Sequence, residues 1–139
     1  MLMNAVLNAT DVRKDWGHFI DTVVRVRPQF VKRNRDKFAA VSIEHLRFLL
    51  SGYRFKVEYQ QEDDGTFTGT LDVFDIAANA PTVEELKREL AKEAVEYANE
   101  YMEEFQLYFN APNRKHHAPY VLNVLIQDDL EGVVGLLDA

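Results

Sequence analysis

The hydrophobic pattern of the first residues predicts one amphipathic helix. Apolar positions spaced three or four residues apart predict a helix over 10–25 with a single buried stripe. The stripe consists of Val12, Trp16, Phe19, Ile20, Val23 and Val24. Asn8 or Thr10 would cap this helix, and a short edge strand is expected just before it, within residues 3–7.

The pattern then changes to short strands. Residues 29–33 and 37–41 predict two strands joined by a turn at 34–36, which together form a hairpin. Ser42 is placed to cap a short helix over 43–50.

A period of two begins at Tyr53 and predicts an antiparallel sheet. Apolar and polar residues alternate over 53–60, as expected for a strand with one buried face. An acidic turn with an Asp-Gly step at 62–65 leads into a return strand over 66–71, and 73–76 is a third segment.

A long helix follows, with a clear start. Thr82 and Glu85 form a capping box, and the helix is predicted over 83–108 until the break at 110–113.

The last apolar segment permits two interpretations. Residues 119–137 suit two short helices that split near Asp128, whereas 120–126 alone would also suit a buried strand. The helical interpretation is preferred because Pro119 fits a first helical position and Asp128 fits a cap.

These elements predict an α+β fold with two parts. The period and the sign of the charge both change at Gly52, so we expect one domain over 1–52 and a second over 53–139. The first would have a β-α-β-β-α order and the second a β-β-β-α order with a helical C-terminal segment. A domain of about fifty residues rarely has a sufficient core of its own, so we expect the first to dimerise.

Composition argues against several classes of protein. The chain of 139 residues has no cysteine, so it can form neither disulfides nor zinc–thiolate clusters. No apolar run approaches the length of a membrane span, and the N-terminus does not resemble a signal peptide. We therefore expect a cytoplasmic protein without a membrane role.

Charge is segregated along the chain, although the net value is −7. Residues 1–50 carry nine Lys or Arg against five Asp or Glu, a balance of +4. Residues 51–139 carry seven basic against eighteen acidic residues, a balance of −11. The split fits a first part that binds a polyanion such as DNA and a second part that binds a cationic protein. The alternative is two unrelated solvated faces.

Several short motifs support the hypothesis that the first part of the chain binds DNA. They are Thr10-Asp11-Val12-Arg13, Val31-Lys32-Arg33, Ala39-Ala40-Val41 and Ser42-Ile43-Glu44. In order and spacing they resemble the N-terminal domain of the Phd/YefM antitoxins, although the hairpin turn lacks the usual glycine. The resemblance implies a dimer that binds operator double-stranded DNA and represses its own toxin–antitoxin operon.

This resemblance directs attention to the basic residues of the first domain. Arg13 would reach a phosphate or a groove edge beside the helix N-terminus, and the basic hairpin would add a second patch. The expected DNA-binding residues are Thr10, Arg13, Lys14, Lys32, Arg33, Arg35 and Lys37. Each of these charges would otherwise be an ordinary solvated side chain.

The second domain resembles the core of the HicB antitoxins, a partial RNase H-like unit. The shared features are the Tyr53–Val57 strand, the acidic turn into Phe67, the third segment Asp72–Ile76 and the Pro81–Leu86 helix start. The resemblance implies that this part neutralises a cognate toxin, which we expect to be a basic ribonuclease of RelE or HicA type.

Two sets of residues in the second domain are candidates for binding the toxin. One is the acidic side of the long helix, where the alternative is a plain solvent face; the other is the apolar tail over 110–139, where core packing is the commoner role. The expected toxin-binding residues are Glu89, Glu93, Glu96, Glu100, Leu122, Leu125 and Ile126.

Catalysis has little support. The adjacent acidic pairs fall in turns or caps, His116 and His117 have no further ligand at a metal-site spacing, and no Gly-rich phosphate loop occurs. We expect no enzyme activity, no cofactor and no metal. Two hypotheses remain: a dimeric DNA-binding antitoxin, and an interaction module with a Phd-like dimerisation domain that does not bind DNA.

Overall fold

The computed structural model describes all 139 residues. The chain forms two compact units, Met1–Leu49 (unit 1) and Leu50–Ala139 (unit 2). Both contain helices and strands, so the predicted α+β class is confirmed.

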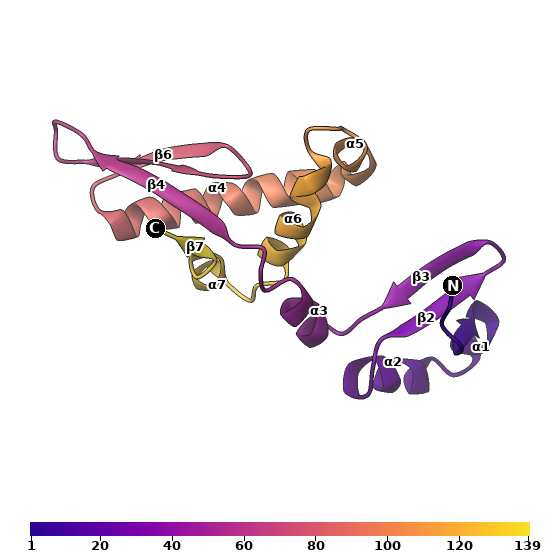
Figure 1. The fold of residues 1–139 in the computed structure, drawn as a ribbon. Helices are drawn as coiled ribbons and strands as arrows, with labels where there is room; N and C mark the ends of the chain where they lie inside the picture. The colour runs from indigo at the N-terminus through magenta and orange to yellow at the C-terminus, as the bar shows by residue number, and fades with distance from the viewer. The chain divides into compact units, whose positions relative to one another are not determined.

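Unit 1 is a small three-stranded sheet with helices. Its elements are β1 (Val6–Asn8), α1 (Ala9–Lys14), α2 (Trp16–Arg25), β2 (Gln29–Arg33), β3 (Asp36–Ala40) and α3 (Ile43–Leu49). The sheet order is β1-β2-β3, with β1 parallel to β2 and β3 antiparallel to it (Figure 1). The predicted short edge strand and hairpin are therefore present, with strand ends shifted by a residue or so.

The single helix predicted over 10–25 is wrong, because it is interrupted at Asp15. This residue leaves the helical conformation, with φ −136° and ψ 65°, and its carboxylate accepts a hydrogen bond from the backbone N–H of His18 at 3.4 Å. Asp competes with helical hydrogen bonding in this way and favours caps, so it ends α1 and begins α2. Of the two predicted caps, Asn8 occupies the N-cap position of α1 but makes no side-chain cap bond, and Thr10 lies inside the helix.

The core of unit 1 is small. Only Val12, Phe19, Val23 and Val31 form its buried apolar cluster. Half of the predicted stripe is therefore exposed, since Trp16, Ile20 and Val24 lie outside this cluster.

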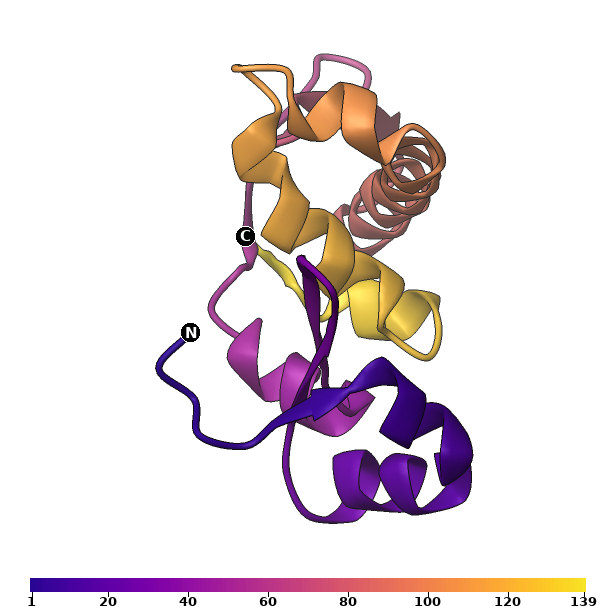
Figure 2. The same cartoon turned by 90° about the vertical axis from the view of Figure 1, so that its right-hand side faces the viewer.

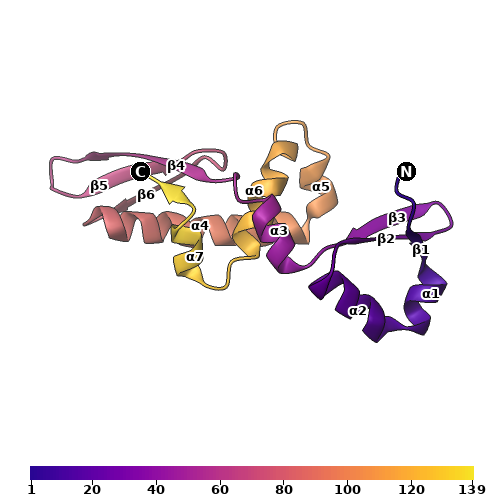
Figure 3. The ribbon, with the colours of Figure 1, turned by 60° about the horizontal axis from the view of Figure 1, so that its bottom comes forward.

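Unit 2 is a four-stranded sheet packed against helices. Its elements are β4 (Phe55–Gln61), β5 (Phe67–Leu71), β6 (Ile76–Ala80), α4 (Val83–Glu103), α5 (Phe105–Phe109), a 3₁₀ turn η1 (Lys115–His117), α6 (Ala118–Leu125), α7 (Leu130–Val134) and β7 (Leu137–Asp138). The sheet order is β6-β5-β4-β7, in which only β7 is parallel to its neighbour (Figure 3).

Helix α4 is the centre of the core in unit 2. It packs against β6 and β5 on one side and against α6 and α7 on another. Figure 2 views α4 nearly end-on, with α6 beside it. One of the two hydrogen bonds of the predicted capping box is present: the hydroxyl of Thr82 accepts a hydrogen bond from the backbone N–H of Glu85 at 3.1 Å. The tail is part of this core, to which it contributes Ala118, Val121, Val124, Val133, Leu136 and Leu137.

Close contact between sheet and helix requires glycine at one position. A Cβ atom on Gly69 of β5 would lie 2.7 Å from Cδ2 of Leu86 and 3.1 Å from the carbonyl oxygen of Glu58. The absence of a side chain therefore lets α4 approach the sheet closely.

Three further predictions for unit 2 need correction, and one strand was not predicted. The third strand lies at 76–80 rather than 73–76, because Val73 and Asp75 adopt left-handed φ values of 65° and 54° and form a turn. The helix predicted over 83–108 ends at Glu103, and Asp129 rather than Asp128 caps α7 through the N–H of Gly132. Strand β7 has no counterpart among the predicted elements.

Candidate functional site

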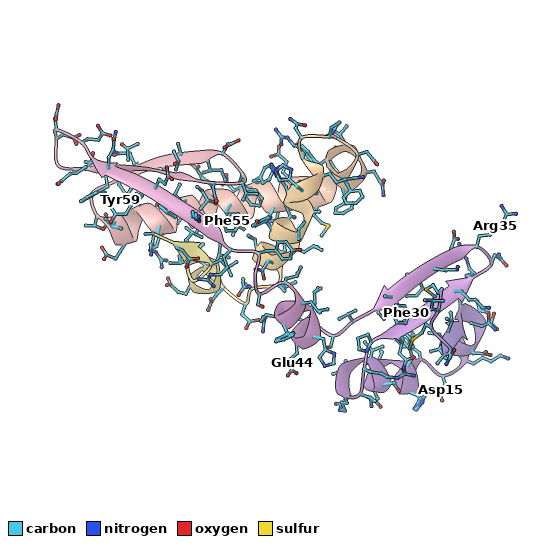
Figure 4. The ribbon with its side chains drawn as sticks, in the orientation of Figure 1. Asp15, Phe30, Arg35, Glu44, Phe55 and Tyr59 are labelled. Atoms are coloured by element: carbon cyan, nitrogen blue, oxygen red, sulfur yellow. The ribbon has the colours of Figure 1, made fainter.

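The register of the sheet in unit 1 brings Thr10 and the predicted DNA-binding residues of the hairpin to one end. Asn8 of β1 pairs with Lys32 of β2, so α1 begins at the end of the sheet where the β2–β3 turn lies. Arg33 pairs with Asp36 across that turn, and Figure 4 shows Arg35 at its tip. Thr10 in α1 and the basic hairpin therefore belong to the same end of unit 1.

All seven predicted residues are exposed, but Arg13 is not where the sequence suggested. Arg13 and Lys14 form the last turn of the short helix α1, next to the break at Asp15, instead of lying near the start of a long helix. Only Asp15 separates this turn from the start of α2.

The ion pairs of unit 1 are weak. Arg33 pairs with Asp36 at 3.1 Å and Arg25 pairs with Asp21 at 2.9 Å, and all four side chains are largely exposed. Such pairs contribute at most about 1 kcal/mol, so a phosphate would displace Asp36 from Arg33 at little cost.

Helix α2 exposes an apolar strip on its surface, although the ring of Trp16 stacks on that of Phe19. Trp16, Ile20 and Val24 lie four residues apart and are 57%, 40% and 48% exposed. Residues at this spacing share one helix face, so they form a continuous apolar strip.

The predicted acidic residues of unit 2 are all exposed on α4. Glu89 pairs with Lys92 at 3.1 Å on the same helix. The other three predicted residues, Glu93, Glu96 and Glu100, form no ion pair with a neighbouring basic side chain. The predicted apolar residues of the tail are half-buried: Leu122 and Leu125 on α6, and Ile126 directly after it.

A polar, aromatic-lined cavity of about 600 Å³ was not predicted. The hydroxyl of Tyr97 lies 2.6 Å from Nδ1 of His117, and the guanidinium of Arg114 lies over the rings of Tyr97 and Tyr108. His117 is only 7% exposed, and burial lowers its pKa. Burial likewise raises the pKa of Tyr97, so both groups stay neutral near neutral pH. The pair His116-His117 looked isolated in sequence because the partner of His117 is twenty residues away.

The described side chains form no group of three or more His, Cys, Asp and Glu residues arranged to hold a metal ion. None of the helices combines the length and the apolar character needed to cross a membrane.

Comparison with known proteins decides the family. A model of the PHD-like family, described as the antitoxin of RelE/RelB toxin–antitoxin systems, matches residues 3–139 and so spans both units. The chain belongs to this antitoxin family. The partner of such an antitoxin is a toxin.

One solved structure is closely similar to this antitoxin. It is a crystal structure from Syntrophomonas wolfei subsp. wolfei, described as the antitoxin part of a proposed toxin/antitoxin system. The two share 40% sequence identity over 95% of each chain, with a TM-score of 0.89. No curated protein matches the antitoxin.

Proposed function

We propose that this antitoxin acts through two oppositely charged surfaces. Unit 1 would bind operator DNA as a dimer and repress the protein's own operon, whereas unit 2 would neutralise a cognate basic toxin by direct binding. The observation that carries the proposal is the placement of charge: basic residues gather at one end of the sheet in unit 1, and glutamates line α4 in unit 2.

Chemistry supports DNA as the ligand of unit 1. The arginines at positions 13, 33 and 35 are exposed, and a guanidinium can contact a phosphate or a guanine edge through two N–H groups at once. The exchangeable ion pair of Arg33 with Asp36 leaves this residue available for such a contact.

The small core supports the dimer. Four buried apolar residues are few for a unit of this size, and the Trp16–Ile20–Val24 strip offers further apolar area to a second copy. DNA binding as a dimer corresponds to the Phd/YefM-like character of the first domain.

The acidic helix supports a cationic partner for unit 2. Ribonuclease toxins that bind RNA carry basic surfaces, so a RelE- or HicA-like toxin is the expected partner of a HicB-like unit. Neutralisation by binding needs no catalytic group. The proposed binding to operator DNA implies that the protein acts in the cytoplasm.

The DNA half is tested by fluorescence anisotropy with a labelled duplex from the region upstream of the gene. Binding should weaken steeply as salt rises, and the double variant Arg13→Ala/Arg33→Ala should lose it. Arg25→Ala is the matched control, because Arg25 is an exposed arginine in an ion pair on α2. If the wild-type protein binds no DNA at low salt, unit 1 is an interaction domain instead.

The toxin half is tested by co-expression with the product of the adjacent open reading frame. We expect the two proteins to co-purify and growth inhibition by the toxin to be relieved. Reversal of the acidic residues, as in Glu93→Lys/Glu100→Lys, should weaken the complex, and more strongly at low salt. Full neutralisation by this variant would remove α4 from the toxin interface.

A further inference from the structure

The outer edge of β6 is open and lacks the features that usually protect an edge strand. β6 ends its sheet, with β5 on one side and no strand on the other. Its sequence, Ile-Ala-Ala-Asn-Ala, contains neither a charge nor a proline. Edge strands are normally protected by lysine, proline, bulges or a covering element. By contrast, the edge strand β3 of unit 1 carries Asp36 and Lys37.

The hydrogen-bond pattern shows which backbone groups face this open edge. Asp72, directly after β5, donates its N–H to the carbonyl of Lys56 in β4, so even-numbered residues on this strand bond toward β4. Bonding alternates along an antiparallel strand, so the odd-numbered residues of β5 bond toward β6. Their partners in β6 are Ile76, Ala78 and Ala80. Ala77 and Asn79 therefore direct their N–H and C=O groups outward.

A row of glutamates lies beside this edge. Leu86 and Leu90 of α4 face the core, and Arg88 forms an ion pair with Glu131 of α7, which fixes the flank of α4 that faces α7. The helical repeat places Glu89, Glu93 and Glu100 on the opposite flank. α4 contacts β6 and β5, and α7 leads into β7 at the other edge of the sheet, so the flank turned away from α7 lies on the β6 side.

The negative charge of these glutamates distinguishes between the partners that could pair with this edge. A second copy paired two-fold along β6 would bring two α4 helices together with glutamates opposing glutamates, and like charges in contact are destabilising. A strand that carries lysine or arginine would instead gain backbone hydrogen bonds and neutralise the row.

We propose that the open edge of β6 pairs with a β-strand of a cationic partner, whose basic side chains contact Glu89 and Glu93. This rests on the proposed function, in which that partner is the basic toxin. Ala80 is buried on the α4 side of β6, and side chains of an added strand alternate between faces. Basic residues are therefore expected at every second position of the partner strand.

The test uses the full-length, ¹⁵N-labelled protein and a short peptide of alternating lysine and valine. We expect the peptide to shift the amide signals of Ala77 and Asn79 and to slow their hydrogen exchange. Ala77→Pro removes an outward N–H without removing a bond to β5, and should weaken binding about tenfold. Ala77→Ser keeps the N–H and is the matched control.

A second variant keeps the test decisive if Ala77→Pro unfolds. Glu89→Lys/Glu93→Lys changes only exposed side chains and should transfer the preference from the lysine–valine peptide to a glutamate–valine peptide. The proposal is overturned if the lysine–valine peptide does not bind, if its shifts map outside β6, or if Ala77→Pro, still folded, binds as well as Ala77→Ser. Concentration-dependent protection of the same amides in the protein alone would overturn it in favour of a second copy.

Co-purification with the product of the adjacent open reading frame distinguishes a failure of the β6 proposal from a failure of the proposed antitoxin function. If folded Ala77→Pro retains the toxin as well as Ala77→Ser does, the toxin contacts another surface, so this inference fails while the proposed function stands. If the wild-type protein binds no toxin but the peptide still pairs with β6, the proposed function fails while the cationic strand site stands.

Discussion

Units 1 and 2 reach stability by different means. Seventeen buried apolar side chains form the core of unit 2, whereas four form that of unit 1. Unit 1 also exposes an apolar strip on α2, while the long helix of unit 2 has its apolar side buried and its glutamates in solvent. The difference indicates that unit 2 is stabilised by its own packing, and it supports the proposal that unit 1 gains stability from a second copy.

The largest expected effect comes from truncating the core of unit 2. Leu90 is fully buried, so Leu90→Ala should lower the free energy of unfolding by about 2–5 kcal/mol. Leu90→Met is the matched control and should cost less than about 1.5 kcal/mol. Urea denaturation followed by far-UV circular dichroism measures this, while Trp16, the only tryptophan, reports unit 1 by fluorescence. Equal shifts in both signals would contradict the contrast between the units.

A polar contact inside unit 2 sharpens the comparison. Tyr97→Phe removes the hydroxyl that bonds Nδ1 of the buried His117, and should cost about 1–3 kcal/mol because the imidazole nitrogen is left unsatisfied. The same urea titration measures the loss. Tyr59→Phe is the control, because that tyrosine is largely exposed. Equal losses in the two variants would show that the contact with His117 adds nothing.

Dilution tests the dependence of unit 1 on a second copy. If two copies associate through the α2 strip, each tenfold dilution should lower the stability reported by Trp16 fluorescence by about 1.4 kcal/mol. Ile20→Glu should abolish this concentration dependence, since it places a charge in the apolar strip. A transition independent of concentration in the wild-type protein would end the idea that unit 1 relies on dimerisation.

The smallest expected effect concerns the C-terminus of unit 2. Arg54 contacts Asp138 at 2.7 and 2.9 Å, and its hydrogen bonds hold the pKa of Asp138 below the usual value. The folded pKa is thus lower than the unfolded one, so this contribution is fully present above the unfolded value of about 3.9 and is lost as pH falls through the folded value. Asp138→Asn should remove that part of the pH dependence, as urea midpoints on either side of this range would show. An unchanged pH profile would contradict it.

Part of unit 2 could be predicted because its signals are local. The alternation after Tyr53, the Asp-Gly turn and the Thr82 cap each depend on neighbouring residues, and each element is present in the structure. The prediction of the third strand at 73–76 is wrong because an apolar residue of this segment packs into the core from a turn. Phe74 packs on Phe55 with ring centroids 4.9 Å apart, which places this segment in a turn rather than in the ladder.

The candidate sites could likewise be predicted only in part. Which residues are basic and which are acidic is visible in the sequence, but their neighbours are not. The common end shared by Thr10 and the hairpin follows from the parallel pairing of β1 with β2, which no local signal encodes. The bond between Tyr97 and His117 and the open edge at Ala77 also depend on long-range packing.

The amino-acid sequence by itself determined most of the element types, the segregation of charge and the absence of thiol chemistry, because these depend on residues close together in the chain or on composition alone. Only the tertiary structure decided that β7 completes the second sheet and that β6 is left with a free edge. Strand pairing and side-chain packing join residues distant in sequence, and their free energy outweighs the modest local preferences that a sequence pattern expresses.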